Sequence, residues 1–210
     1  MTKRLLTAVI VTLLAGTHMG LAYAADASYQ EMPAGIYTLD KAHASLVWKV
    51  SHLGLSDYTA RFTRFDAEVE FDPESPEKSK VTATIDPSSV RTDYPYPQKE
   101  DFDKKLAKKA EWFNADAFPE IIFTSTDITM TGENTAVMAG ELTFLGVTHP
   151  VSLNVTFNGA MKEQPFSKKP TLGFSASGSL QRSDWGMNIY LPNLGDQVML
   201  LIEAEFAKEE

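Results

Sequence analysis

Apolar and polar residues alternate along residues 140–157, which read GELTFLGVTHPVSLNVTF. In an extended chain Leu142 and Phe144 lie on one side, whereas Glu141 and Thr143 lie on the other. The alternation starts again after a short turn. This pattern predicts a β-hairpin with one apolar face, and another part of the chain has to cover that face.

The same period of two recurs along most of the chain from residue 36 onward. The segment 58–71 breaks its alternation near Arg64 and Phe65, which predicts a β-bulge. Strands are expected close to residues 36–52, 58–71, 81–86, 121–130, 138–144, 151–157, 172–180 and 198–206. About eight strands at this spacing are typical of an all-β sandwich or barrel.

One helix is predicted, over residues 100–113, between the third and fourth strands. Acidic residues occupy its first turn and lysines follow, which complements the helix dipole. Its apolar stripe comprises Phe102, Leu106, Ala110 and Phe113. One helix cannot cover eight strands, so either two sheets pack together or one sheet closes on itself. The long strands favour an eight-stranded antiparallel barrel, because closure removes exposed edges.

The N-terminus has the features of a secretory signal peptide over residues 1–24. A basic start at Lys3 and Arg4 precedes an apolar run, and the small-residue pattern of Ala22-Tyr23-Ala24 predicts cleavage after Ala24. A retained N-terminal anchor is the alternative. Residues 25–34 are expected to form a flexible leader, and residues 35–210 the barrel domain. The chain has no cysteine, which suits export to a bacterial periplasm without disulfides.

Composition and motifs argue against several function classes. A formal net charge of −9 without a basic cluster disfavours nucleic acid as a partner, and no apolar run after the signal is long enough for stable membrane insertion. His43, His52 and His149 lack the spacing of metal ligands, so no metal site is predicted. The segment GFSASG at 173–178 is not a nucleophile elbow. We therefore expect no catalytic residues and no cofactor.

Several segments together resemble the YceI-like family. The stretch at 46–54, LVWKVSHLG, is similar to the family pattern F-x-V-x-H-x-G, and GELTFLGVTHPV is similar to G-x-L-T-x-x-G-V-T-x-P-V. DPSSVRTD, EWFNADAFPEIIFTST and QRSDWGM also match family segments, in the same order. The resemblance covers residues 36–207. It implies a lipocalin-like barrel in the periplasm that binds a polyisoprenoid or quinone-like lipid in its interior.

One departure from the family pattern concerns the start of the helix. EDFDKKL stands where many members have R-D-x-H-L. If that Arg and His touch a ligand head group in relatives, the contact is altered here. The expected apolar ligand-binding residues lie on the inward faces of the strands, although a dry core could use the same side chains. They are Trp48, Val50, Phe62, Ile85, Phe123, Met138, Leu142, Phe144, Leu153, Val155, Phe174, Leu200 and Ile202.

Polar and flexible residues are expected at the barrel mouth, and each has a structural alternative. His52 continues an inner face and could contact a head group or serve as a structural histidine. Arg182 and Asp184 could pair to brace their loop or bind a polar head. Trp185 could cap the mouth or anchor the loop, and Met187 offers an adaptable surface.

The predicted function is that of a non-enzymatic carrier or binding protein with an isoprenoid lipid as its ligand. A barrel-based hydrolase or isomerase is the first alternative, with His52 and either Asp184 or Arg182 in acid–base roles. An envelope stress protein with a dry core is the second alternative. The sequence does not determine the oligomeric state, and a homodimer is possible.

Overall fold

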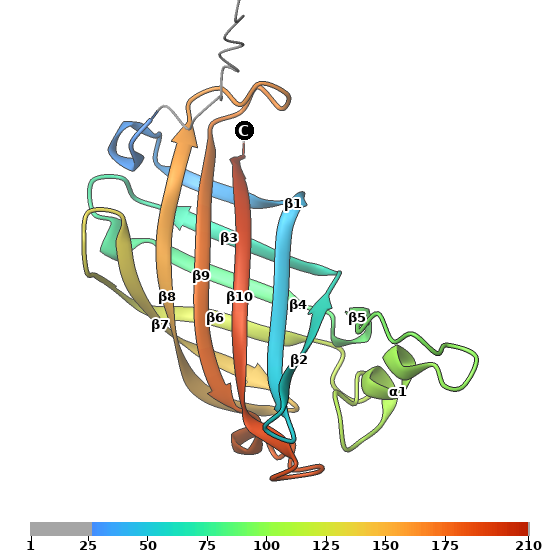
Figure 1. The fold of residues 1–210 in the computed structure, drawn as a ribbon. Coiled ribbons are helices and arrows are strands. Elements are labelled where there is room, and N and C mark those ends of the chain that lie inside the picture. The colour runs from blue at the N-terminus through green and yellow to red at the C-terminus, as the bar shows by residue number, and fades with distance from the viewer. Residues whose placement is uncertain (1–26, 210) are drawn as a thin grey trace, which may run out of the picture.

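The computed structural model describes residues 27–209, and its strands form a single antiparallel sheet that closes on itself (Figure 1). Closure comes from β10, which pairs with β9 on one side and with β1 on the other. The strands are β1 (Gly35–His52), β2 (Ser56–Phe62), β3 (Phe65–Phe71), β4 (Lys80–Ile85), β5 (Val90–Arg91), β6 (Ile121–Met130), β7 (Thr135–Phe144), β8 (Val147–Met161), β9 (Thr171–Gln181) and β10 (Leu194–Lys208).

These ten strands occupy eight positions around the barrel, because two of the positions are each shared by two short strands. The first part of β1 pairs with β3 and its last part with β2, so that β2 and β3 lie end to end. In the same way β4 pairs with β3, and β5 with β2. The interruption lies at the predicted bulge, where the Ser89 hydroxyl accepts hydrogen bonds from the backbone N–H groups of Thr63 and Arg64. The predicted closed eight-stranded barrel is confirmed.

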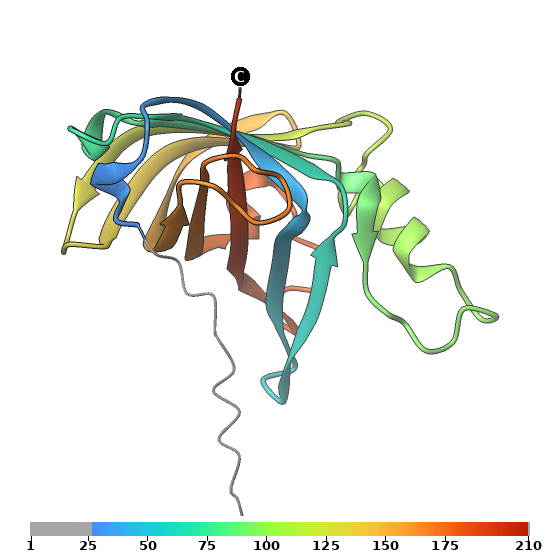
Figure 2. The ribbon, with the colours of Figure 1, turned by 90° about the horizontal axis from the view of Figure 1, so that it is seen from above.

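Helix α1 (Phe102–Lys108) lies between β5 and β6, as predicted, and outside the strand wall beside β2 and β5 (Figure 2). The Asp101 carboxylate caps it by accepting a hydrogen bond from the backbone N–H of Lys104 at 3.0 Å. The predicted end at residue 113 is wrong, because the backbone becomes extended at Lys109. Leaving the helix allows Phe113 to pack on Phe62, with ring centroids 5.2 Å apart.

The barrel has two ends, which we call the α1 end and the terminal end. At the α1 end β1 turns into β2, β7 into β8, and β9 leads through the 3-10 helix η4 (Arg182–Trp185) to β10. At the terminal end β1 begins and β10 finishes, beside the 3-10 helix η1 (Tyr29–Glu31) (Figure 1). The shorter 3-10 segments η2 (Pro76–Lys78) and η3 (Pro87–Ser89) flank β4.

Residues 27–34 pack against the terminal end and are not the loose leader that was predicted. Ala27 forms an isolated bridge with Ala160, and the Met32 side chain is buried. The Tyr37 hydroxyl donates a hydrogen bond to the Pro33 carbonyl oxygen at 2.8 Å. The apolar Met32 side chain drives this packing, because it leaves water for a cluster of buried residues.

The predicted signal peptide, residues 1–24, lies outside the described residues. Within residues 27–209, no helix has the length and apolar character needed to cross a bilayer.

Candidate functional site: the barrel interior

The barrel encloses a cavity of about 710 Å³. Its wall includes residues from both ends, such as Phe71 and Phe157 at the terminal end and Tyr58 and Phe144 at the α1 end. The cavity therefore follows the barrel axis instead of occupying one side of it. A volume of this size lies within the range of roughly 300–1,000 Å³ that is usual for small-molecule sites.

The strand alternation produces the apolar wall, because every second side chain points to the interior. On β1, Trp48 and Val50 are inward and buried, and Trp48 lies opposite Leu200 of β10. All the residues that the sequence predicted for the site line this cavity, except Asp184 and Trp185. The residues that do so are Trp48, Val50, His52, Phe62, Ile85, Phe123, Met138, Leu142, Phe144, Leu153, Val155, Phe174, Arg182, Met187, Leu200 and Ile202.

Trp185 anchors its loop to the wall and does not cap the mouth. Its side chain is 3% exposed, and its indole N–H donates a hydrogen bond to the Leu142 carbonyl oxygen at 3.2 Å. The ring packs against Phe144 and makes an edge contact with His149. His149 is accordingly half-buried beside Trp185.

Arg182 holds the loop between η4 and β10 in place. Its buried guanidinium donates hydrogen bonds of 2.7–2.9 Å to the carbonyl oxygens of four residues, and burial lowers the pKa of the Arg182 guanidinium. The four acceptors are Met187, Ile189, Leu194 and Gly195. The loop-bracing interpretation therefore fits the geometry, and a guanidinium engaged in this way has little capacity left for a head group.

The acid that supports this loop is Asp196, whereas Asp184 is exposed and contributes nothing to the cavity wall. Asp196 accepts hydrogen bonds from the backbone N–H and the hydroxyl of Ser183, at 2.9 and 2.7 Å. The predicted Arg182–Asp184 pairing was wrong. Asp184 was chosen because it is close to Arg182 in the sequence, whereas Asp196 reaches this loop only because β10 folds back beside η4.

Polar side chains of the wall lie mainly near the two ends. His52, Lys105 and Asn193 lie at the α1 end, while Glu133 and Asn134 lie where β6 turns into β7 at the terminal end. Between the ends the wall is hydrocarbon, with one polar exception at Trp48. The cavity is thus suited to an elongated apolar molecule.

An aromatic cluster at the α1 end was missed by the search for inward strand residues. The Phe113 ring contacts Trp48, Phe62 and Phe144, with centroids 5.2–6.1 Å apart. Phe102 of α1 meets the edge of Tyr58 in the same region. The signal in the sequence was the apolar stripe that included Phe102 and Phe113, which indicated that this segment faces the barrel but not what it would contact.

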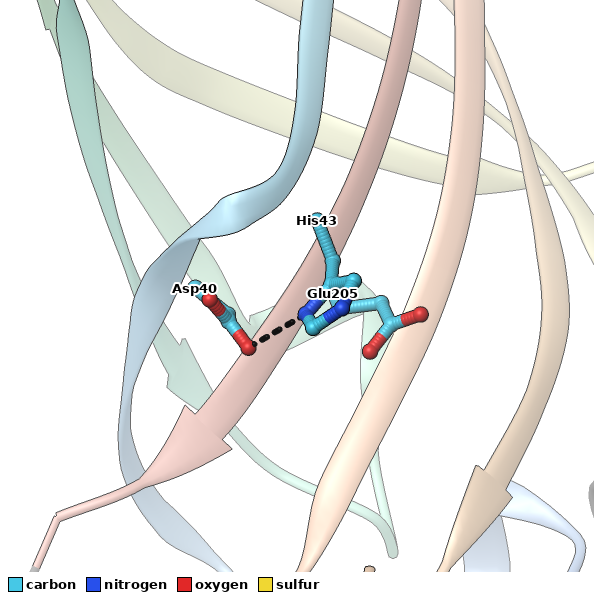
Figure 3. A group of neighbouring side chains, drawn as sticks. All are labelled: Asp40, His43 and Glu205. Atoms are coloured by element: carbon cyan, nitrogen blue, oxygen red, sulfur yellow. Dashed lines mark hydrogen bonds and ion pairs between the residues drawn. The ribbon is translucent and has the colours of Figure 1, made fainter. Parts of the chain in front are cut away.

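Asp40, His43 and Glu205 form a second cluster of side chains (Figure 3). None of the three residues lines the cavity. One potential ligand atom from each lies within 4.8 Å of the others, so the three side chains could hold a metal ion. The cluster arises because β1 shifts register against β10 between Leu39 and Ala44. Sequence spacing could not reveal it, since Glu205 is brought in by strand pairing.

Hydrogen bonds within this cluster give it a structural role. Asp40 accepts from the backbone N–H of Ala42 at 2.9 Å and is hydrogen-bonded to His43 Nδ1 at 2.8 Å. That hydrogen bond and the charges of Asp40 and Glu205 raise the pKa of His43, while the hydrogen bond with His43 lowers the pKa of Asp40. The pair braces the bulge of β1 on the outer surface of the barrel.

Comparisons with known proteins agree with this fold. Residues 37–206 match the family model described as YceI-like domain. A UPF0312 protein of Pseudomonas putida (strain GB-1) is 36% identical over 156 residues, which are 73% of this chain and 77% of that protein. A UPF0312 protein of Enterobacter sp. (strain 638) is 33% identical over 212 residues and covers 100% of both chains.

Solved structures have the same architecture. The YceI protein of Campylobacter jejuni matches with a TM-score of 0.63 at 29% identity, over 77% of this chain and 91% of that one. Two more distant neighbours show the fold alone. Burkholderia cenocepacia BcnA has a TM-score of 0.68 at 22% identity, covering 80% and 98% of the two chains. A polyisoprenoid binding domain from Saccharophagus degradans has a TM-score of 0.59 at 13% identity, covering 84% and 100%. By the match of residues 37–206 to the family model, the chain belongs to the YceI-like family.

Proposed function

We propose that this protein binds a polyisoprenoid lipid, with a polyprenyl or quinone-like structure, inside the barrel and carries it through the periplasm. The observation that supports this most is the apolar cavity of about 710 Å³ that extends between the two ends. The Saccharophagus degradans neighbour, which is described as a polyisoprenoid binding domain, has the same fold. Export to the periplasm rests on the signal peptide predicted for residues 1–24.

The dimensions of the barrel suit a chain of several isoprene units. The 15 residues of β10 span roughly 50 Å at about 3.3 Å each, and a tilt of about 40° leaves a wall roughly 38 Å tall. Burial contributes about 0.8 kcal/mol per CH₂-sized group, or on the order of 4 kcal/mol per five-carbon unit. Association costs about 4–15 kcal/mol, so several units are needed for tight binding.

The geometry supports a binding protein over the hydrolase or isomerase alternative. Acid–base catalysis needs a titratable group within hydrogen-bonding reach of the substrate. Arg182 is engaged by loop carbonyl oxygens, and Asp184 lies away from the cavity, so His52 loses both partners considered for it. A cavity of this size also argues against the envelope stress protein with a dry core.

The proposal is tested by mass spectrometry of an organic extract from the protein purified under native conditions. We expect an isoprenoid lipid in near-stoichiometric amount. Leu142→Trp fills part of the cavity from β7 and should lower the lipid content at least severalfold. Glu141→Trp is the matched control, because Glu141 is exposed on the adjacent position of the same strand.

Two results would contradict the proposal. One is the absence of an isoprenoid from the native protein, even after loading with excess lipid. The other is equal lipid content in Leu142→Trp, Glu141→Trp and the unaltered protein, with all three folded by circular dichroism.

A further inference from the structure

The indole N–H of Trp48 has an unusual environment. Trp48 is 9% exposed and forms part of the cavity wall. In the part of the chain that the structure describes, its Nε1 is the one buried side-chain polar atom without a hydrogen-bond partner. An unpaired buried donor is destabilising, and the large majority of buried polar groups in native proteins have a hydrogen-bond partner.

The surroundings of Trp48 do not provide an acceptor side chain. Its partners across β2 and β10 are Ala60 and Leu200, which are apolar. The nearest aromatic contact is Phe113, whose ring meets that of Trp48 edge-on at 6.1 Å. By contrast, the indole N–H of Trp185, which is 3% exposed, donates to the Leu142 carbonyl oxygen. The protein therefore provides a hydrogen-bond acceptor for the indole N–H of Trp185 but none for that of Trp48, whose N–H is available to a ligand.

We propose that the Trp48 N–H donates a hydrogen bond to an oxygen atom of the bound isoprenoid. This inference rests on the proposed function and specifies the ligand class: an isoprenoid whose head carries a carbonyl or similar acceptor, such as a quinone ring. Trp48 precedes His52, the last residue of β1, by four positions, or roughly 13 Å along the strand. The head group then lies inside the cavity and not at the rim beside His52.

Access to this donor involves the segment that follows α1. Phe113 belongs to that segment and not to a barrel strand, so it can move without breaking the hydrogen bonds of a β-ladder. Phe113 lines the cavity and contacts Trp48, so its ring lies beside a head group that is bound at Trp48.

Trp48→Phe tests the proposal, because it keeps an aromatic ring and removes the donor. The YceI-like sequence pattern also has phenylalanine at this position. Calorimetric titrations would use two probes: a benzoquinone with a four-unit prenyl tail, and a benzene ring with the same tail. We expect the ratio of quinone affinity to hydrocarbon affinity to fall about two- to tenfold, the range for loss of one neutral hydrogen bond.

His52→Ala is the comparison variant for a head group at the rim. We expect its affinity ratio to stay closer to that of the unaltered protein than the ratio of Trp48→Phe. An unchanged ratio in Trp48→Phe, or a ratio that falls in His52→Ala alone, would overturn the inference while leaving isoprenoid binding intact. Failure of the unaltered protein to bind either probe would refute the proposed function as well.

Indole N–H signals in NMR spectra provide a second measurement. The quinone probe should shift the Trp48 signal downfield, and the hydrocarbon probe should shift it much less. Trp185 is the internal reference, because its N–H already donates to Leu142. Equal shifts of the Trp48 signal with both probes would count against a hydrogen bond.

Discussion

Replacement of Arg182 by methionine tests whether this residue organises the α1 end. The guanidinium donates hydrogen bonds to four carbonyl oxygens of residues 187–195 and is 2% exposed. Methionine fills a similar volume and supplies no donor. Each buried acceptor left without a partner costs about 1–3 kcal/mol, and water at the rim can replace some of the lost bonds. We therefore expect Arg182→Met to lower the free energy of unfolding by about 3–5 kcal/mol, a large part of the 5–15 kcal/mol typical of a domain.

Urea denaturation followed by circular dichroism measures this change. Arg64→Met is the matched control, because Arg64 is an exposed arginine that pairs with Asp86 and Ser88. An exposed pair of this kind contributes about 0–1 kcal/mol. If Arg182→Met is no more destabilising than Arg64→Met, the loop is not held by the buried guanidinium and the argument fails.

Two further predictions concern pH. Burial raises the pKa of Tyr37 to about 12. Its contribution to the free energy of unfolding is therefore complete below pH 10 and is lost as the pH rises through 12. The loss in the free energy of unfolding should reach at most about 2–3 kcal/mol. In urea denaturation between pH 10 and pH 12, the free energy of unfolding should decline less in Tyr37→Phe than in the unaltered protein. Identical declines in the two proteins would refute the assignment. The pKa of His43 should exceed 6.5 in an NMR titration and fall in Asp40→Asn. Because the pKa of His43 is raised and that of Asp40 is lowered, the stabilisation by this pair should be complete between pH 3.8 and pH 6.5, the ordinary pKa values of the two groups. It should fade as the pH rises through the pKa of His43 or falls through the pKa of Asp40. An unaltered His43 titration in Asp40→Asn would contradict the assignment.

Much of the cavity wall could be predicted because the direction of a side chain in a strand is a local property. The alternation around Leu142 and Phe144 places them on one face whatever the rest of the chain does. Helix α1 was predicted in position but not in length, since Lys109 has no local signal to end it. Its end depends on Phe113, which gains contacts inside the barrel that the sequence does not display.

The sequence by itself determined the strands, their apolar faces and the all-β class of the domain. These features follow from the alternation of apolar and polar residues, which is a local property of the chain. Only the tertiary structure decided which distant groups meet. Pairing of β1 with β10 closes the barrel and brings Glu205 to His43, and the return of β10 gives Ser183 its partner Asp196. These contacts join residues far apart in sequence, so they are set by closure of the whole sheet and by no local pattern.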